Sequence, residues 1–561
     1  MRVRLAFPLF LGVALSGLAR PVWPQCQTAT LAPGAGQVGG ELATSVSVSG
    51  TTAVAGSPGT DGSGMDSGAV HVFEDPGTGW TETAVLVASD GAGDARFGAS
   101  VVLAGDVLFV GAPGGDGAVA DSGAVYVFER MGGLWMEVQK LVAANGEALD
   151  AFGTALALSG ATALVGAPLG DGAAADSGAV YVFELQPAGW VQTAVLTAGD
   201  GDAGDRFGGS VSLSGDTAWI GASLDDVDGP GGPPPVLIDA GSAYAFERTG
   251  GVWSEDAKLV PAGASAFDRF GTSVSVSGET ALVGASFGEG EVPNSGAAHV
   301  FERVASVWTE AAVLAPGDGA GLDRFGIAVA IDGDTAVVGA DLADDAALDA
   351  GAAVVYRRNT LCAPPPQGIW IEVPQLVPCG AASGDQTGRA VAISGDTVVL
   401  GAPRDDGAAA DGGAAYVYSF PVPQLSRTFL AGDVAELSLG GGGGTQSFCL
   451  TSYPPLPGGC LYFLLGTTSG TSPGVPVDQA VLPLNPDAYT DLTLIFPNLP
   501  PLLKNTLGTL TVEGQGSAKV SLPGTAALVG TVLHHAYLAF DVSQFGLVTF
   551  ASNPVALTLL P

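Results

Sequence analysis

The sequence predicts an all-β protein whose main part is a seven-bladed β-propeller. Three observations predict this fold. A unit of about 55 residues recurs seven times, each unit holds four strand-like runs, and one further strand stands at the N-terminus, where it completes the last unit. A period of this length is typical of solenoids, propellers and arrays. Four short antiparallel strands per unit favour the propeller among them.

Composition agrees with many short strands joined by tight turns. The 561 residues include 86 Gly and 37 Pro, 47% are hydrophobic, and only 13% are charged. Gly and Pro punctuate turns, whereas long helices would need far fewer of either. The length is sufficient for more than one domain with a large buried core.

Each unit opens on the same short motif, which fixes its alignment. The opening positions are Leu42, Phe97, Phe152, Phe207, Phe270, Phe325 and Thr387. Successive positions are 55, 55, 55, 63, 55 and 62 residues apart. In the second unit, "GASVVLAG" and "DVLFVGAP" form a predicted first hairpin, and "GAVYVFER" and "WMEVQKLVA" a second. Alternating apolar residues on either side of a two-residue turn indicate paired strands.

The count of fourth strands predicts how the ring closes. A tryptophan begins this strand in six units, at Trp80, Trp135, Trp190, Trp253, Trp308 and Trp370. The seventh unit stops after residues 414–420 and lacks the strand. "CQTATLAPG", which begins at Cys26, is similar to the fourth-strand sequence "VQTAVLTAG" from Val191. We therefore expect the N-terminal strand to complete the last blade, so that the propeller spans residues 26–420 and has no open edge between its ends.

Phe-Gly followed by Gly-Ala-Pro resembles the FG-GAP repeat of integrin α-subunit propellers and of many exported bacterial proteins. The resemblance covers residues 26–420 and implies a β-propeller with a ligand-binding or adhesive role. Integrin-type repeats often carry a D-x-D-x-D-G-x-x-D calcium loop between the two motifs. Here the connection is a tight turn, such as residues 214–217, which is too short to surround calcium with six to eight oxygens. The usual inter-strand calcium site is therefore not expected, although Ca²⁺ stays a candidate cofactor elsewhere.

Features present in every unit are interpreted as scaffold. The phenylalanines of Phe-Gly and the tryptophans are expected to pack, and the recurrent Asp-Ser-Gly is expected to cap a turn. The loops that join second to third strands, and those that join one unit to the next, open on one face of a propeller. Both sets are rich in Asp, so this face is expected to be strongly negative.

Departures from the repeat provide the candidate sites. The fourth unit inserts residues 229–238 among acidic residues, which makes Asp225, Asp226, Asp228 and Asp239 candidates for a ligand-binding face. "DGDAGD" precedes the same unit, and the spacing of Asp200, Asp202 and Asp205 suits calcium ligands without forming the full twelve-residue loop. An insertion without function explains the extra residues equally well.

The first 25 residues predict export. Arg2 and Arg4 precede an apolar run from Leu5 to Leu18 that is too short to span a membrane, as in a secretory signal peptide. Five cysteines in an exported chain favour disulfides. Cys449 and Cys460 flank a proline-rich turn and are predicted to pair. A Cys26–Cys362 bond is predicted to hold the ring closed, and a Cys362–Cys379 bond would exclude it.

Residues 421–561 lack the repeat and are predicted to form a small β-sandwich. Alternating runs such as "LYFLLG" and "GTLTVEG" are separated by turns rich in Gly and Pro. The segment is similar to C-terminal modules of exported planctomycete-type proteins, which suggests a role in sorting or surface attachment.

Charge and motif content narrow the function. Residues 21–420 carry 49 acidic and 13 basic residues, which disfavours nucleic acid as a partner. No Ser-His-acid set, distinctive carboxylate pair, cofactor fingerprint or transmembrane segment is found. We therefore expect an exported, non-enzymatic protein, secreted or at the cell surface, that binds an extracellular protein or glycan. The alternatives are an extracellular polysaccharide hydrolase or lyase on a propeller scaffold, and a structural component of the cell envelope.

Overall fold

The structure is a computed structural model that describes residues 27–419 apart from 35, 229–235, 291, 317–318, 360–368 and 373–374. Outside that range it describes only the backbones of individual strands. The chain divides into two compact units. One comprises residues 21–360 and 365–419, and the other comprises residues 1–20, 361–364 and 420–561.

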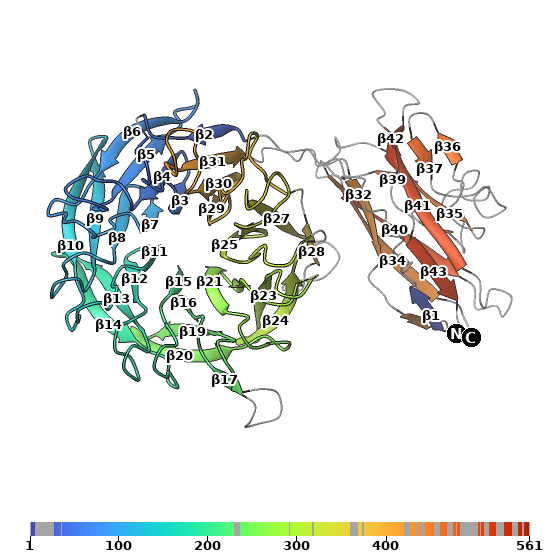
Figure 1. Cartoon of the computed structure of the whole chain (residues 1–561). Helices are drawn as coiled ribbons and strands as arrows, with labels where there is room; N and C mark the ends of the chain where they lie inside the picture. The colour runs from blue at the N-terminus through green and yellow to red at the C-terminus, as the bar shows by residue number, and fades with distance from the viewer. Residues whose placement is uncertain are drawn as a thin grey trace. The chain divides into compact units, whose positions relative to one another are not determined.

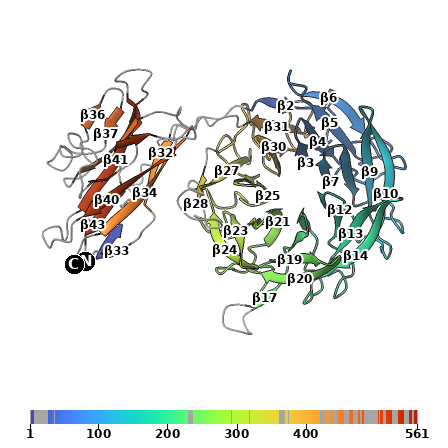
Figure 2. The ribbon, with the colours of Figure 1, turned by 180° about the vertical axis from the view of Figure 1, so that it is seen from behind.

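The first unit is a ring of seven four-stranded antiparallel sheets, seen from its two sides in Figure 1 and Figure 2. Blade 1 contains β3 (Ser45–Ser49), β4 (Thr52–Ser57), β5 (Ala69–Glu74) and β6 (Thr81–Leu86). Blade 2 contains β7 (Ser100–Ala104), β8 (Val107–Ala112), β9 (Ala124–Met131) and β10 (Leu134–Leu141). Blade 3 contains β11 (Ala155–Ser159), β12 (Thr162–Ala167), β13 (Ala179–Gln186) and β14 (Gly189–Leu196).

Blades 4 to 6 repeat this order. Blade 4 contains β15 (Ser210–Ser214), β16 (Thr217–Ala222), β19 (Ser242–Thr249) and β20 (Val252–Leu259), with β17 (Val227–Asp228) and β18 (Val236–Leu237) paired in its second loop. Blade 5 contains β21 (Phe270–Ser277), β22 (Thr280–Ala285), β23 (Ala297–Val304) and β24 (Val307–Leu314). Blade 6 contains β25 (Ala328–Asp332), β26 (Thr335–Ala340), β27 (Ala352–Asn359) and β28 (Ile369–Glu372).

Blade 7 closes the ring with a strand from the N-terminus, as predicted. Its order is β2 (Ala29–Leu31), β31 (Ala414–Ser419), β30 (Thr397–Ala402) and β29 (Ala390–Ser394). Ala29 pairs with Val417 and Leu31 pairs with Ala415. The first described strand of the propeller therefore pairs with the last, and the ring has no break between its ends.

The repeated Phe-Gly and Gly-Ala-Pro motifs meet at the boundary between neighbouring blades. Phe97 is fully buried and packs edge-on against Tyr126, with ring centroids 5.5 Å apart. Gly98, which follows it, has a φ of 91° and lies against Gly56 of the preceding blade. A Cβ atom added at Gly56 would lie 1.9 Å from the carbonyl oxygen of Gly98. A side chain at Gly56 would block this approach, so glycine is required on this side of the boundary. At the boundary between blades 7 and 1, Gly401 keeps this role, whereas Ala43 replaces the glycine of Phe-Gly with a φ of 69°.

Charged side chains join neighbouring blades at the ends of the third strands. The guanidinium group of Arg303 in blade 5 donates to Glu247 of blade 4 at 2.5 Å, and it lies over the Trp308 ring, 5.7 Å from the ring centroid. The corresponding arginines pair with the glutamate of the preceding blade in the same way, in Arg130–Glu74, Arg248–Glu184 and Arg358–Glu302. These tryptophans therefore act as packing residues, as the sequence predicted.

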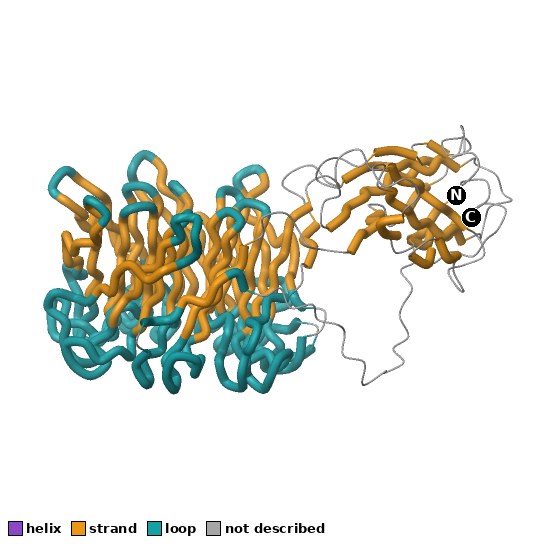
Figure 3. Tube along the Cα trace, turned by 90° about the horizontal axis from the view of Figure 1, so that it is seen from above, coloured by secondary structure: helices purple, strands orange, loops and turns teal. Residues whose placement is uncertain are grey.

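The two faces of the ring differ in their loops. The first connections in all blades, and the third connections in blades 1 to 5, are short and lie on one face. The second connections, and the links from one blade to the next, are longer and lie on the opposite face, called the loop face below (Figure 3). The acidic residues predicted for one face belong to these longer loops.

The second unit is described by its strands alone. One sheet has the order β33-β1-β43-β41-β35-β39 with β42 beside β41, another has β32-β34-β40-β38, and β36 pairs with β37. Their bounds are β1 (Arg2–Leu5), β32 (Arg427–Gly432), β33 (Glu436–Ser438), β34 (Gly444–Tyr453), β35 (Leu461–Thr467), β36 (Val475–Val477), β37 (Ala480–Leu482), β38 (Leu503–Lys504), β39 (Leu507–Thr509), β40 (Gln515–Leu522), β41 (Val532–Phe540), β42 (Val548–Ala551) and β43 (Val555–Leu559). The predicted β-sandwich stays a prediction.

The predicted cysteine pairs lie outside the described residues. This applies to the side chains of Cys26, Cys362, Cys449 and Cys460. Cys379 is described and is disulfide-bonded, and its backbone N–H donates to the side-chain oxygen of Gln27 at 2.9 Å. Among the described residues, no helix is long and apolar enough to cross a membrane.

Candidate functional site

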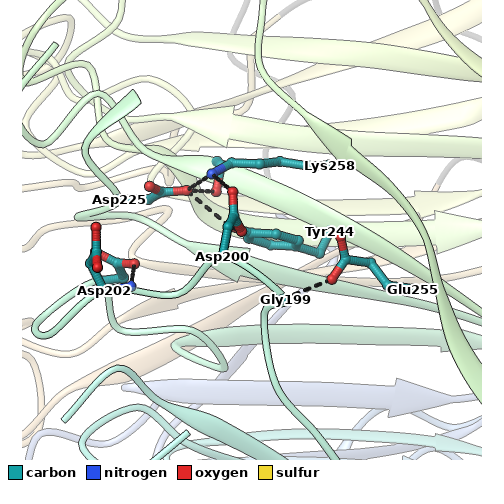
Figure 4. Close-up of polar contacts among 9 residues, drawn as sticks. Gly199, Asp200, Asp202, Asp225, Tyr244, Glu255 and Lys258 are labelled. Atoms are coloured by element: carbon teal, nitrogen blue, oxygen red, sulfur yellow. Dashed lines mark hydrogen bonds and ion pairs between the residues drawn. The ribbon is translucent and has the colours of Figure 1, made fainter. Parts of the chain in front are cut away.

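A network of charged and polar side chains lies on the loop face of blade 4 (Figure 4). The ammonium nitrogen of Lys258 lies 2.7 Å from a carboxylate oxygen of Asp200 and 2.7 Å from one of Asp225. The Tyr244 hydroxyl lies 2.9 Å from Oδ1 of Asp200 and 3.0 Å from Oδ2 of Asp225. Ser242 donates to the same Asp225 oxygen at 2.5 Å. Two carboxylates therefore share one ammonium group and one phenol.

Strand register and two loops bring these residues together. Tyr244 on β19 pairs directly with Lys258 on β20, so both side chains leave the same face of the blade. Asp200 follows β14 in the link between blades 3 and 4, whereas Asp225 follows β16 in the second connection of blade 4. The network ties two loops of different origin to the third and fourth strands of one blade.

The electrostatics of the network favour the charged forms of its acid and base. Burial alone would raise the pKa of Asp200, but hydrogen bonds from Lys258 and Tyr244 hold it below its ordinary value. Burial alone would lower the pKa of Lys258, yet its hydrogen bonds to Asp200 and Asp225 raise it. Burial and the negative charge of Asp225 raise the pKa of Tyr244, which keeps the phenol protonated.

Part of this arrangement recurs in blade 2. Lys140 lies 2.6 Å from Asp90, and the Tyr126 hydroxyl donates to Asp90 at 2.7 Å. Lys140 and Lys258 are the two lysines of residues 26–420. Each stands 14 residues after the tyrosine on the third strand of its blade, Tyr126 or Tyr244. That spacing was the signal in the sequence from which this network could have been predicted. Blade 4 differs because Asp225 supplies a second carboxylate.

The predicted calcium ligands do not converge on one point. Asp200 is held by Lys258, whereas Oδ2 of Asp205 accepts the backbone N–H of Asp202 at 2.6 Å within its own loop. Burial raises the pKa of Asp205 to about 6. Within the part of the chain that the structure describes, no group of three His, Cys, Asp or Glu residues is arranged to hold a metal ion. The calcium site at these residues therefore stays a prediction without structural support.

The predicted ligand-face acids have unequal roles. Oδ1 of Asp226 accepts the backbone N–H of Asp239 at 2.8 Å, and Asp239 has a left-handed φ of 50°. Equivalent pairs are found in five other blades, as Asp61–Asp66, Asp116–Asp121, Asp171–Asp176, Asp344–Asp349 and Asp406–Asp411. The Asp-Ser-Gly position thus belongs to a capped turn, and Asp226 and Asp239 form this turn in blade 4. Asp228 lies on β17, and its side chain is outside the described residues.

Comparison with known families agrees with this geometry. A family model described as the FG-GAP repeat matches residues 26–73, 80–128, 135–183, 190–246, 253–301, 308–356 and 370–418. The chain belongs to the FG-GAP repeat family. Each of the seven matches covers the fourth strand of one blade and the first three strands of the next blade, and the first match begins just before β2, the strand that closes the ring. None of the curated proteins compared matches the chain.

Membership of the FG-GAP repeat family supports a general role as a scaffold for binding or adhesion. The network in blade 4 is consistent with such a scaffold. Lys258 is paired with both carboxylates, and among the described residues no group of three His, Cys, Asp or Glu residues is arranged to hold a metal ion. The effect of the network is to fix two loops of the loop face.

Proposed function

We propose that this FG-GAP propeller is an exported, non-enzymatic protein whose loop face binds an extracellular protein or glycan. The observation that carries the proposal is the structural difference between the two faces of the propeller. Neighbouring blades are joined by arginine–glutamate pairs on one face, whereas the longer and more variable loops gather on the other. Binding residues are commonly found on loops that a rigid scaffold holds in place.

The two histidines of the propeller support a role without catalysis. Nδ1 of His71 lies 2.6 Å from Glu82, and Nδ1 of His299 lies 2.7 Å from Glu310. Both histidines are buried on third strands, in the column that tyrosine fills in other blades. They act there as strand-pairing residues. The proposal also includes two predictions from the sequence. Residues 1–25 act as a signal peptide that directs export, and residues 421–561 attach the exported protein to the cell surface.

Direct binding measurements test this proposal against the enzymatic alternative. The labelled chain would be applied to immobilised extracellular proteins and to a panel of polysaccharides, with and without a calcium chelator. We expect saturable binding to at least one class, without release of reducing ends or unsaturated products from any polysaccharide. Turnover of a polysaccharide would favour the hydrolase or lyase instead. Absence of saturable binding to every ligand would favour a structural role in the envelope.

A further inference from the structure

The arginine–glutamate pair that joins neighbouring blades is missing between blades 2 and 3. At four other boundaries, an arginine at the end of the third strand pairs with the glutamate of the preceding blade. Blade 3 has Leu185 in the place of this arginine, so Glu129 of blade 2 has no guanidinium group opposite it. Among the described residues, the partly exposed carboxylate of Glu129 makes no hydrogen bond or ion pair.

The difference at this boundary lies in the side chain and not in the path of the backbone. The N–H of Leu185 donates to the carbonyl oxygen of Ala161, in the first turn of blade 3, at 2.8 Å. The N–H of Arg130 makes the same bond to Asp106 in blade 2, also at 2.8 Å. Leu185 therefore stands where an arginine would stand. Its side chain is shorter and uncharged, so it leaves Glu129 without a counter-charge.

No basic residue of either blade compensates for this loss. Arg130 follows Glu129 in sequence, so its side chain leaves the opposite side of the strand, where it pairs with Glu74 of blade 1. Lys140 on β10 is paired with Asp90. Residues 141–205, which include all of blade 3, contain no lysine or arginine. The charge of Glu129 is thus uncompensated, in a chain whose formal net charge is already −37.

Exposed apolar side chains surround this glutamate. Glu129 on β9 pairs directly with Met136 on β10, and Met131 pairs with Leu134 in the same hairpin. Directly paired residues, and residues two apart on a strand, share one face, so these four side chains lie together. Met131, Leu134 and Met136 are 47%, 71% and 52% exposed, and Leu185 of blade 3 is 48% exposed.

Printed contacts across the boundary bring Leu185 to the same place. The side chain of Gln139 on β10 donates to the carbonyl oxygen of Trp190 at 2.7 Å and accepts its N–H at 2.8 Å. Trp190 pairs directly with Leu185, and its ring lies edge-on to Phe109 of blade 2, with centroids 4.9 Å apart. Phe109 is on β8, the strand beside β9 and its Glu129. The strands β10 and β14 follow one another along the outside of the ring (Figure 1).

We propose that Glu129, Met131, Leu134, Met136 and Leu185 form a docking surface for a protein segment that carries an arginine beside an apolar side chain. The chain itself indicates this ligand, because a guanidinium group pairs with the corresponding glutamate at four other boundaries. Guanidinium groups bind carboxylates through paired hydrogen bonds. Exposed methionine and leucine supply an adaptable apolar contact around that pair.

This surface lies on the outer rim of the ring, beside the short turns. It is separate from the loop face, so the inference goes beyond the proposed function and does not depend on it. A net negative charge on the whole chain would also favour the approach of a basic segment.

Subtractive selection from a random-peptide phage library tests the surface. The library is depleted on the full chain carrying Leu185→Arg and is then selected on the original chain. The new arginine should occupy Glu129 and keep the melting temperature, because the backbone bond of Leu185 matches that of the arginines. We expect the surviving peptides to hold Arg beside an apolar residue and to bind the Leu185→Arg chain about tenfold more weakly, or less.

Two further variants and a matched control locate the bound peptides. Glu129→Gln keeps the shape but removes the charge, and it should weaken the peptides about tenfold. Leu134→Ser should weaken them as well, through lost apolar contact. Val252→Ser is the control, because Val252 begins the fourth strand of blade 4 as Leu134 begins that of blade 2, and it is 69% exposed. Arg303 already occupies Glu247 beside it, so this change should leave binding unaltered.

Three results would overturn the inference. If no peptide survives the depletion, this rim binds no protein segment, and loop-face binding keeps its own test. If the surviving peptides lack arginine, or bind Glu129→Gln as tightly as the original chain, the charge of Glu129 does not select the ligand. If Leu185→Arg lowers the melting temperature, Glu129 does not accept a guanidinium group and the comparison with the other boundaries fails.

Discussion

The ammonium group of Lys258 lies 2.7 Å from the carboxylate of Asp225, a side chain that is only 6% exposed. The same ammonium group reaches Asp200 in the preceding link. Lys258 thus stands between two carboxylates, in the place that a bound cation would take in a metal-dependent loop. Lys258, on the fourth strand of blade 4, therefore supplies the positive charge that holds the loops of Asp200 and Asp225.

Replacing Lys258 should therefore destabilise the propeller. Lys258→Met keeps the aliphatic stem but leaves Asp225 buried without a cation, which we expect to cost about 3 kcal/mol in the free energy of unfolding. Lys140→Met is the matched control, because Asp90 is half exposed and its loss of a partner should cost less than about 1 kcal/mol. Chemical denaturation measures both. Equal losses for the two variants would contradict the role assigned to Asp225.

Calcium is not expected to bind saturably at Asp200, Asp202 and Asp205. Lys258 is ion-paired with Asp200, and Oδ2 of Asp205 accepts the backbone N–H of Asp202. Calorimetric titration should show only the weak, gradual heat that sodium chloride also produces, and a chelator should leave the melting temperature unchanged. A saturable isotherm that Asp200→Asn removes would restore the calcium site predicted from the sequence.

Acidification should stabilise the propeller before it denatures it. Burial raises the pKa of Asp205 to about 6 from an ordinary value of 3.8, and it raises the pKa of Asp150, Asp268 and Asp385, which occupy the same loop position. A raised carboxyl pKa means that the folded state binds the proton more tightly. Stability therefore increases as pH falls through about 6, and the gain is complete below about 4.

For Asp205 alone, the gain has an upper bound of about 3 kcal/mol, since one pKa unit corresponds to about 1.4 kcal/mol. Asp90 and Asp200, whose pKa values are lowered, oppose it only at lower pH. Melting temperatures at pH 7, 6 and 5 measure the effect. Asp205→Asn keeps an acceptor for Asp202 but cannot titrate, so its melting temperature should depend less on pH. A melting temperature that falls steadily from pH 7 to 5 would count against this reading.

The cysteine pairing can be settled by peptide mapping without reduction. Cys379 is disulfide-bonded, and its N–H contacts Gln27, the neighbour of Cys26 in sequence. We therefore expect a peptide in which Cys379 is joined to Cys26, which would tie the closing strand to the link that precedes blade 7. Recovery of Cys379 joined to Cys362 would contradict this pairing. Recovery of Cys26 joined to Cys362 would return to the pair predicted from the sequence.

Ring closure could be predicted because it follows from counting. Six fourth-strand tryptophans for seven units require one strand from elsewhere, and the segment from Cys26 matches that strand. The pairing of Leu31 with Ala415 confirms it. Phe97 was equally predictable, since a residue repeated in nearly every blade is more simply scaffold than site.

The blade 4 network could not be assembled from the sequence in the same way. Lys258 meets Asp200 and Asp225 only after strand register and two separate loops are known. Asp226 and Asp239 are a different case. Both are acidic and flank an insertion, so they suggested a ligand face, but the carboxylate of one caps the backbone of the other. Aspartates five residues apart in other blades, such as Asp116 and Asp121, were the available signal that this pair is a turn.

Thr387 offers a final test of the repeat itself. It stands where five other blades have phenylalanine, it is fully buried, and its hydroxyl oxygen has no hydrogen-bond partner. A buried hydroxyl without a partner costs about 1 kcal/mol or more. Thr387→Val removes the hydroxyl and keeps the shape, so we expect the free energy of unfolding to rise by about 1 kcal/mol.

The control for this change is Thr154→Val. The Thr154 hydroxyl donates to the carbonyl oxygen of Ala151 at 2.7 Å, so its removal should lower the free energy of unfolding by about 1 kcal/mol. If the free energy of unfolding rises for Thr387→Val and falls for Thr154→Val, the Thr387 hydroxyl destabilises the fold, as a consequence of the departure from the Phe-Gly motif. A loss of stability in Thr387→Val would instead mean that this hydroxyl is satisfied in solution, for instance by a buried water.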